Sequence, residues 1–167
     1  RRDIFLKIGG FDASFPSANN EDTELSYRMS KSGYKMVFNP DAIVYHLNHP
    51  DSIIRYAWLK FWRGYWRMVV YKRFPGKMIK DTYTPQTLKF QILFFYLSLI
   101  TLLMLAIWQK LTFLFLFNIV AFVFSTLPFT FFAFKKDPIV GILAPFFLLI
   151  RAGSLGAGVI CGVVVSK

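Results

Sequence analysis

Two long runs without a charged side chain most constrain what this chain can fold into. The first holds 17 residues, 92–108, and the second holds 24, 111–134. Helices of these lengths extend roughly 26 and 36 Å at about 1.5 Å per residue, which brackets the roughly 30 Å hydrocarbon core of a bilayer. Neither run has the polar face of a soluble core helix. We therefore predict two membrane-spanning helices with a tight turn at Gln109 and Lys110.

A third apolar run, 139–166, is interrupted by Arg151. An arginine near the middle of a bilayer is costly, so its guanidinium should face protein, water or a headgroup. Two interpretations stay open. Either the run crosses the membrane once, or it breaks near Arg151 and its later part packs closely on a neighbour through a series of glycines. The predicted membrane domain spans residues 90–167, with helices at about 91–109, 111–134 and 139–165.

The charged side chains divide the remaining sequence into two parts. Residues 1–50 carry six basic and six acidic side chains, whereas residues 51–89 carry nine basic and two acidic ones. Most of the net charge of +11 therefore lies directly before the first apolar run. That position favours anionic lipid over nucleic acid, and the positive-inside tendency places residues 1–89 in the cytoplasm. We expect an integral, multi-pass membrane protein with no nucleic-acid partner.

The basic part is also rich in tryptophan. Trp58, Trp62 and Trp66 recur every four residues and so form one slowly rotating stripe on a helix. Such a helix suits a membrane interface, with aromatic rings at headgroup depth and long basic chains reaching water. Basic and aromatic residues together also suit single-stranded nucleic acid, but the membrane helices leave that alternative unsupported. We predict a basic amphipathic interfacial helix and linker over residues 51–89.

The first 50 residues predict an α/β unit. A helix is expected after the exposed loop 12–20, because Asn20 is a good N-cap, acidic residues fill the first turn and Gly33 follows as a C-terminal stop. Residues 35–38 and 42–46 are rich in β-branched and aromatic side chains and flank a turn sequence. The pattern predicts a helix followed by two strands, as part of a layered α/β domain.

Four ordered strings resemble the C-terminal part of family 2 glycosyltransferases, over about residues 1–80. They are Gly9-Gly10-Phe11-Asp12, Glu21-Asp22-Thr23-Glu24-Leu25-Ser26-Tyr27-Arg28, Gly33-Tyr34-Lys35 and Ala42-Ile43-Val44-Tyr45-His46. The resemblance implies a GT-A fold, so the expected fold class is α/β, followed by the interfacial helix and an α-helical membrane bundle. It also implies that the chain is the C-terminal part of a longer enzyme, inactive alone because the donor pocket lies upstream.

The resemblance also assigns roles to single residues. Asp22 takes the position of the general base that activates an acceptor hydroxyl, with Glu21 holding it or contacting the acceptor. His46 matches a ligand position for the Mg or Mn ion on the donor phosphates, whose main ligands are expected upstream in an Asp-x-Asp motif. His49 is a rival for that role. Outside the resemblance, acids in a first turn are also common as helix caps, and a histidine is ordinary at a strand end.

The string Trp62-Arg63-Gly64-Tyr65-Trp66 loosely resembles an interfacial helix of membrane synthases that holds diphosphate and acceptor sugar. It makes Arg63 a candidate for phosphate and Trp62 and Trp66 candidates for the acceptor, although Gly64 stands where a tryptophan is expected. The predicted function is inverting transfer from a nucleotide sugar to a lipid-linked or saccharide acceptor at the cytoplasmic membrane face. The alternatives are a processive polysaccharide synthase and a non-enzymatic membrane anchor.

Overall fold

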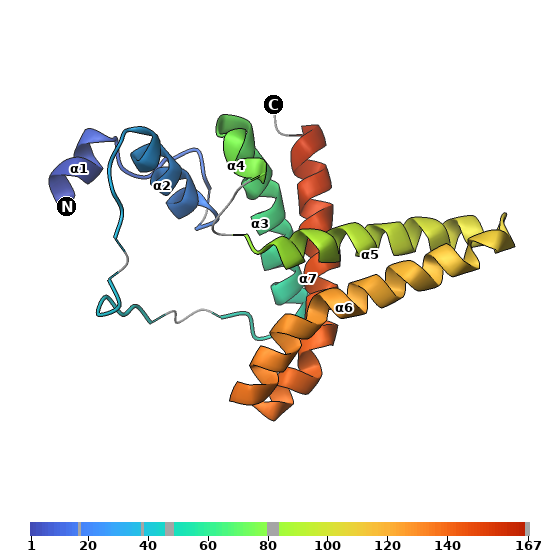
Figure 1. The fold of residues 1–167 in the computed structure, drawn as a ribbon. Coiled ribbons are helices and arrows are strands. Elements are labelled where there is room, and N and C mark those ends of the chain that lie inside the picture. The colour runs from blue at the N-terminus through green and yellow to red at the C-terminus, as the bar shows by residue number, and fades with distance from the viewer. Residues whose placement is uncertain (17, 38, 46–48, 80–83, 166–167) are drawn as a thin grey trace.

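The computed structural model describes residues 1–16, 18–37, 39–45, 49–79 and 84–165, and the regular structure of these residues is entirely helical (Figure 1). In chain order the elements are α1 (Arg2–Lys7), α2 (Glu21–Lys31), α3 (Ile53–Arg73), α4 (Gly76–Ile79), α5 (Gln86–Leu105), the 3-10 turn η1 (Gln109–Leu111), α6 (Thr112–Lys136) and α7 (Pro138–Val165).

The predicted α/β class is wrong for the part of the chain that the structure describes, because none of those residues forms a strand. Residues 35–37 and 42–45 are irregular, and their apolar side chains are open to solvent: Val37 is 88% exposed and Val44 76% exposed. A strand needs a neighbour to pair its N–H and C=O groups, and a second layer to cover its apolar face. No described segment supplies either one, so local β propensity is not realised there.

The two N-terminal helices both end at glycines, as the sequence predicts for Gly33. Gly33 has a φ of 81°, and the N–H groups of Gly33 and Tyr34 donate to carbonyls of the last turn of α2 at 3.1 and 3.2 Å. Together these bonds form a Schellman motif, which favours glycine because a β-carbon disfavours positive φ. The same pattern closes α1, where Gly9 and Gly10 have φ values of 89° and 66°.

The segment 12–20 is exposed at Ala13, Ser14, Pro16 and Ala18, as its polarity suggests, but three of its other residues are buried. Phe15, Asn19 and Asn20 are each only 8% exposed. The ring of Phe15 packs 5.1 Å from the ring of Trp66, between centroids, and so attaches the loop to α3. Because burial of aromatic surface is strongly stabilising, this contact overrides the polar composition of the loop. The cluster that joins α2 to the C-terminal half of α3 consists of Phe15, Tyr27, Val70 and Tyr71.

Helices α3 and α7 lie side by side and run in the same direction. Near their starts the rings of Tyr56 and Phe147 lie 5.6 Å apart, and near their ends Lys72 Nζ donates to the carbonyl of Val163 at 3.2 Å. The basic, tryptophan-rich helix α3 therefore packs directly against α7, and its place at the membrane interface stays a prediction.

The apolar C-terminal half contains three helices long enough to cross a membrane, judged by length and composition: α5, η1 with α6, and α7. Helices α5 and α6 form a hairpin, and α7 runs across it (Figure 1). Helix α7 continues unbroken from Pro138 to Val165, so the structure has no break at Arg151. At the crossing, a β-carbon added to Gly156 would lie 2.3 Å from the ring of Tyr96, which confirms that the glycines of α7 permit close packing.

The approach of α3 to α7 depends on glycine and gives a testable prediction. A β-carbon on Gly158 would lie 1.9 Å from the carbonyl oxygen of Phe61, and backbone cannot rotate away as a flexible side chain can. We expect Gly158→Ala to destabilise the protein by about 1–3 kcal/mol or more, because the helices must separate. Gly76→Ala is the matched control, since nothing lies within 4 Å of its added β-carbon. Thermal unfolding in detergent measures both; equal melting temperatures would contradict the packing.

Candidate functional site

The start of α2 carries the predicted acidic pair, and it is held against the middle of α3. Asn20 precedes α2 with a left-handed backbone, φ 68°, and its side chain makes no capping bond to the helix, contrary to the prediction. Instead the buried Asn20 Nδ2 donates to the backbone carbonyl of Arg63 at 3.1 Å. A neutral buried bond of this kind contributes about 1 kcal/mol, and leaving either group unpaired costs more. The bond places Glu21 and Asp22 next to the helix that bears Trp62 and Arg63.

The two carboxylates of the pair have different surroundings. Asp22 is exposed, and its Oδ1 accepts from the backbone N–H of Thr23 at 2.7 Å and from Thr23 Oγ1 at 3.3 Å. These bonds orient the carboxylate and leave Oδ2 without a partner among the described residues. Glu21 is half-buried, and its Oε2 is shielded from solvent with no hydrogen-bond partner in the described part of the chain. A shielded carboxylate oxygen of this kind is ready to accept a hydrogen bond from a ligand.

Glu24 and Arg28 belong to the same family-like string as the acidic pair, and they form an ion pair that stabilises the fold. Glu24 is 4% exposed, and Arg28 donates to its two oxygens at 3.0 and 2.7 Å. The guanidinium also donates to the carbonyls of Ile8 and Gly10 at 2.6 and 2.8 Å, at the end of α1. The hydrogen bonds to Glu24 raise the pKa of Arg28. This ion pair therefore fixes α1 and the glycine turn to α2.

Asp12 is the last residue of the string Gly9-Gly10-Phe11-Asp12, and it attaches the loop 12–20 to the end of α3. Its carboxylate accepts from the guanidinium of Arg73, which also donates to Ser14 Oγ at 3.2 Å. The backbone N–H of Ser14 donates to Asp12 at 2.8 Å. That bond first, and then Arg73, lower the pKa of Asp12 from 3.8 to about 2. Asp12 is therefore ionised at neutral pH and serves as an anchor.

The tryptophan stripe is divided between two environments. Trp58 is 57% exposed and Trp62 42% exposed, and their rings stack with centroids 6.5 Å apart. Trp66 is half-buried against Phe15. A four-residue step advances about 400° around a helix, so each tryptophan is rotated about 40° from the one before. This drift turns Trp66 toward the protein, whereas Trp58 and Trp62 stay outside and are open to a ligand or lipid.

The structure explains why Gly64 stands where the pattern of the membrane synthases has a tryptophan. A β-carbon at Gly64 would lie 2.2 Å from the carbonyl oxygen of Leu155. No tryptophan can occupy that position while α3 lies against α7. The helix pairing therefore excludes the side chain that the loose resemblance to membrane synthases requires.

Arg63 lines a cavity of about 550 Å³ between α3, α5 and α7. Lys60 faces the same cavity, and burial, followed by the charges of Arg63 and Arg151, lowers its pKa from 10.5 to about 8. Arg151 reaches across from α7 and donates to Gln91 Oε1 on α5 at 2.7 Å. This bond confirms the prediction that Arg151 faces protein. The sequence does not show that Lys60, Arg63 and Arg151 meet, because Arg151 is distant from the other two in the chain.

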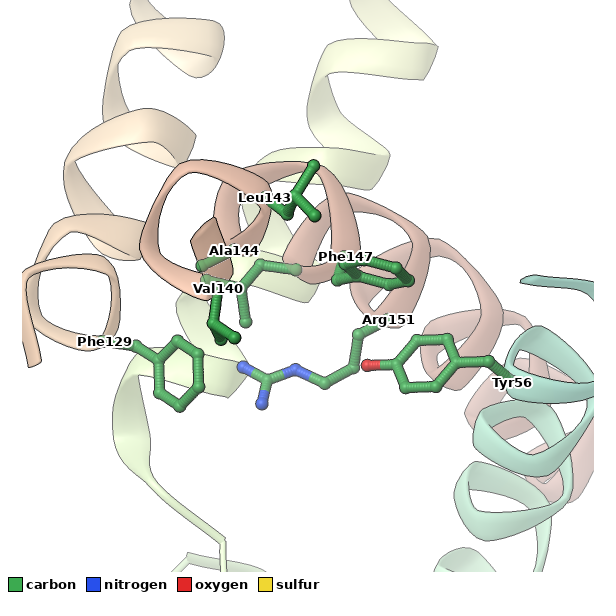
Figure 2. A pocket seen from close by; sticks show the side chains of 8 residues that line it. Tyr56, Phe129, Val140, Leu143, Ala144, Phe147 and Arg151 are labelled. Atoms are coloured by element: carbon green, nitrogen blue, oxygen red, sulfur yellow. The ribbon is translucent and has the colours of Figure 1, made fainter. Parts of the chain in front are cut away.

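A second, smaller cavity of about 250 Å³ lies on the other side of Arg151. Figure 2 shows the Arg151 guanidinium extending toward Phe129 below Val140, with the Tyr56 hydroxyl directed at the arginine side chain. Burial raises the pKa of Tyr56, so its hydroxyl stays protonated at neutral pH. Arg151 thus stands between a mainly apolar cavity and the cationic one.

The predicted metal site does not find support in the described residues. His46 lies outside them, and His49 is described and exposed. Among the residues that the structure places, no three His, Cys, Asp or Glu side chains come together as metal ligands. Because His46 lies outside the described residues, metal binding stays a prediction, and we derive no chemical step through a metal.

Two contacts of this site were missed in the sequence: the Asn20 bond to α3 and the grouping of cations around Arg63. The only signals were an asparagine beside the acidic pair and an arginine within an apolar run.

Comparison with known proteins finds one match. A family model described as glycosyl transferase family group 2 matches residues 1–135, which include the acidic pair and all of α3. No curated protein and no solved structure matches the chain.

Proposed function

Because the chain belongs to the family 2 glycosyltransferases, we propose that it transfers a sugar from a nucleotide sugar to a lipid-linked or saccharide acceptor at the cytoplasmic membrane face. Its three long apolar helices are those of a membrane protein. The observation that carries the proposal is the bond from Asn20 to Arg63, 3.1 Å long, which holds the acidic start of α2 beside the basic and aromatic helix.

Asp22 acts as the general base in this proposal. The acceptor hydroxyl attacks the anomeric carbon as the bond to the nucleoside diphosphate breaks, and the hydroxyl proton passes to the Asp22 carboxylate. Attack opposite the leaving group inverts the anomeric configuration. The exposed position of Asp22 and the bonds from Thr23 to Oδ1 support this role, because they orient the carboxylate and leave Oδ2 accessible.

Glu21 positions the acceptor. Its Oε2 is shielded from water and has no partner among the described residues, so a sugar hydroxyl that donates to it would relieve an unpaired buried oxygen. Arg63, on the adjacent helix, contributes a positive charge suited to phosphate, and Trp62 offers an exposed ring face suited to a sugar. Dependence on Mg or Mn stays a prediction, with His46 as its candidate ligand in this sequence.

The product of the intact protein in membranes tests this function. Membranes supplied with labelled nucleotide sugars should release nucleoside diphosphate and transfer label to a lipid extract or a saccharide. The anomeric configuration of the new bond, read by NMR, should be opposite to that of the donor. Membranes without the protein are the control. Retention of configuration would contradict Asp22 as a base in a single displacement, and equal transfer by the control membranes would contradict the activity itself.

A further inference from the structure

Helices α3 and α7 share a long parallel contact, and α3 is strongly basic. The contact begins where the rings of Tyr56 and Phe147 lie 5.6 Å apart, and it continues to the bond of 3.2 Å from Lys72 to the carbonyl of Val163. This length of helix corresponds to about 24 Å. Helix α3 carries six basic residues and no acidic one. Any placement of α7 in the bilayer therefore also places the cations of α3.

The polar unit of α1 and α2 is attached to the same part of α3. Asn20 donates to the carbonyl of Arg63 at 3.1 Å, and the rings of Phe15 and Trp66 lie 5.1 Å apart. If α7 stood upright across the bilayer, this part of α3 would lie inside the hydrocarbon core, together with the attached unit. The core has no water to solvate the cations or the backbone groups of the loops, so an upright α7 is strongly unfavourable.

Helix α7 crosses α5 and does not lie along it. The Tyr96 hydroxyl donates to the carbonyl of Gly153 at 2.7 Å, and Arg151 donates to Gln91 at 2.7 Å. Figure 1 shows α7 running across the α5–α6 hairpin, so the two directions cannot both follow the bilayer normal. The hairpin is the part that fits the bilayer, because 17 uncharged residues, 92–108, lead from the crossing toward its tip and extend roughly 26 Å.

The exposed tryptophans of α3 face the direction in which the hairpin extends. Lys60 lies two residues from both Trp58 and Trp62, and two residues turn a helix by about 200°, so Lys60 is on nearly the opposite side. Lys60 faces the start of α5, where it lines a cavity together with Lys89. Trp58, 57% exposed, and Trp62, 42% exposed, therefore face away from the start of the hairpin. Indole rings favour the boundary between headgroups and hydrocarbon.

We propose that α3 and α7 lie flat in one membrane interface, that only the α5–α6 hairpin among the described helices crosses the bilayer, and that Trp58 and Trp62 form the surface that rests on the hydrocarbon. Both ends of α7 are then on the side of the membrane where α1 and α2 lie. The partner of this surface is the bilayer itself, with the cations of α3 directed toward headgroups and water. This placement goes beyond the proposed sugar transfer, because it needs neither a donor nor an acceptor.

Solid-state NMR of the unaltered 167-residue chain in aligned bilayers tests the orientation of α7. Five of the ten glycines lie in α7 and one lies in α3, whereas α5 and α6 contain none. In a ¹⁵N-glycine sample we expect the helical amides near the edge of the shift range that belongs to N–H bonds perpendicular to the bilayer normal. A ¹⁵N-leucine sample is the control for alignment, because α5 has seven leucines, which should resonate near the parallel edge. Helical glycine signals at the parallel edge, or no leucine signals there, would overturn the proposal.

Tryptophan fluorescence in bilayers tests the lipid-facing surface. Two variants keep a single tryptophan, Trp62 or Trp66, with phenylalanine at the other three positions. Lipid brominated at a shallow chain carbon should quench Trp62 about twofold or more above Trp66, which is half-buried against Phe15. Equal quenching of the two variants, or free access of aqueous iodide to Trp62, would overturn the surface. No sugar donor or acceptor is present, so these results are independent of the transfer assay.

Discussion

Replacing Asp22 by Asn is expected to lower sugar transfer by the intact enzyme about 10²–10⁴-fold, the usual contribution of a general base. The amide has nearly the same shape and can still accept the bonds from Thr23 through its oxygen, but it cannot take a proton from the acceptor hydroxyl. Binding of the donor should be almost unchanged. The measurements are kcat/KM for transfer and the Kd of the nucleoside diphosphate.

Asp41→Asn provides the control for this prediction. Asp41 is an exposed carboxylate in the turn after α2, outside the acidic pair, and its neutralisation should leave transfer within about twofold of wild type. Glu21→Gln should raise KM for the acceptor more than it lowers kcat, because Glu21 is assigned to positioning. Full activity of Asp22→Asn would remove Asp22 from the mechanism.

Replacing Arg28 by Met should destabilise the unit of α1 and α2 by about 3–5 kcal/mol, because it leaves a buried carboxylate without its main partner. Glu24 is 4% exposed, and the nearest remaining cation is Arg73, whose Nη1 lies 4.0 Å away. Methionine keeps most of the aliphatic stem, so the loss reports on charge and hydrogen bonds. Hydrogen exchange of the α2 amides measures the free energy of local opening.

Arg55→Met is the matched control, because Arg55 also pairs with a carboxylate four residues away. The Arg55–Asp51 pair has a similar distance, 2.8 Å against 2.7 Å for Arg28–Glu24, but its side chains are 70% and 69% exposed. Water screens such a pair, so its loss should change the free energy of local opening far less than the loss of Arg28 does. Similar effects of the two substitutions would mean that burial does not strengthen the Glu24 interaction.

The membrane half and the local ends of helices were predictable from sequence. A long uncharged run has only a helix available in lipid, because every backbone polar group must be paired within the segment. Gly33 and Gly10 terminate helices through backbone geometry that neighbouring residues do not alter. The expectation that Arg151 faces protein was also confirmed, since exposure of a guanidinium to lipid tails is too costly.

The strand predictions failed for a physical reason at the residues that the structure describes, 35–37 and 42–45. Strand propensity at Val37 and Val44 expresses a preference for a pleated, half-covered surface, and pairing with another strand must supply that surface. Helices close their hydrogen bonds locally, whereas strands close them with distant partners. The same dependence on distant contacts explains why the polar composition of segment 12–20 does not predict the burial of Phe15 against Trp66.

The sequence by itself determined that this chain contains membrane-length helices, an acidic helix start at Glu21 and Asp22, and a basic aromatic helix before the bilayer. Those properties depend on near neighbours and on the solvent that each segment requires. Only the tertiary structure decided that α3 lies along α7, that Asn20 bonds to Arg63, and that five cations share one cavity with an apolar wall. These features depend on which helix faces meet. The shapes of the helix surfaces decide that, above all at glycines such as Gly158, and the order of residues does not reveal which faces will pack together.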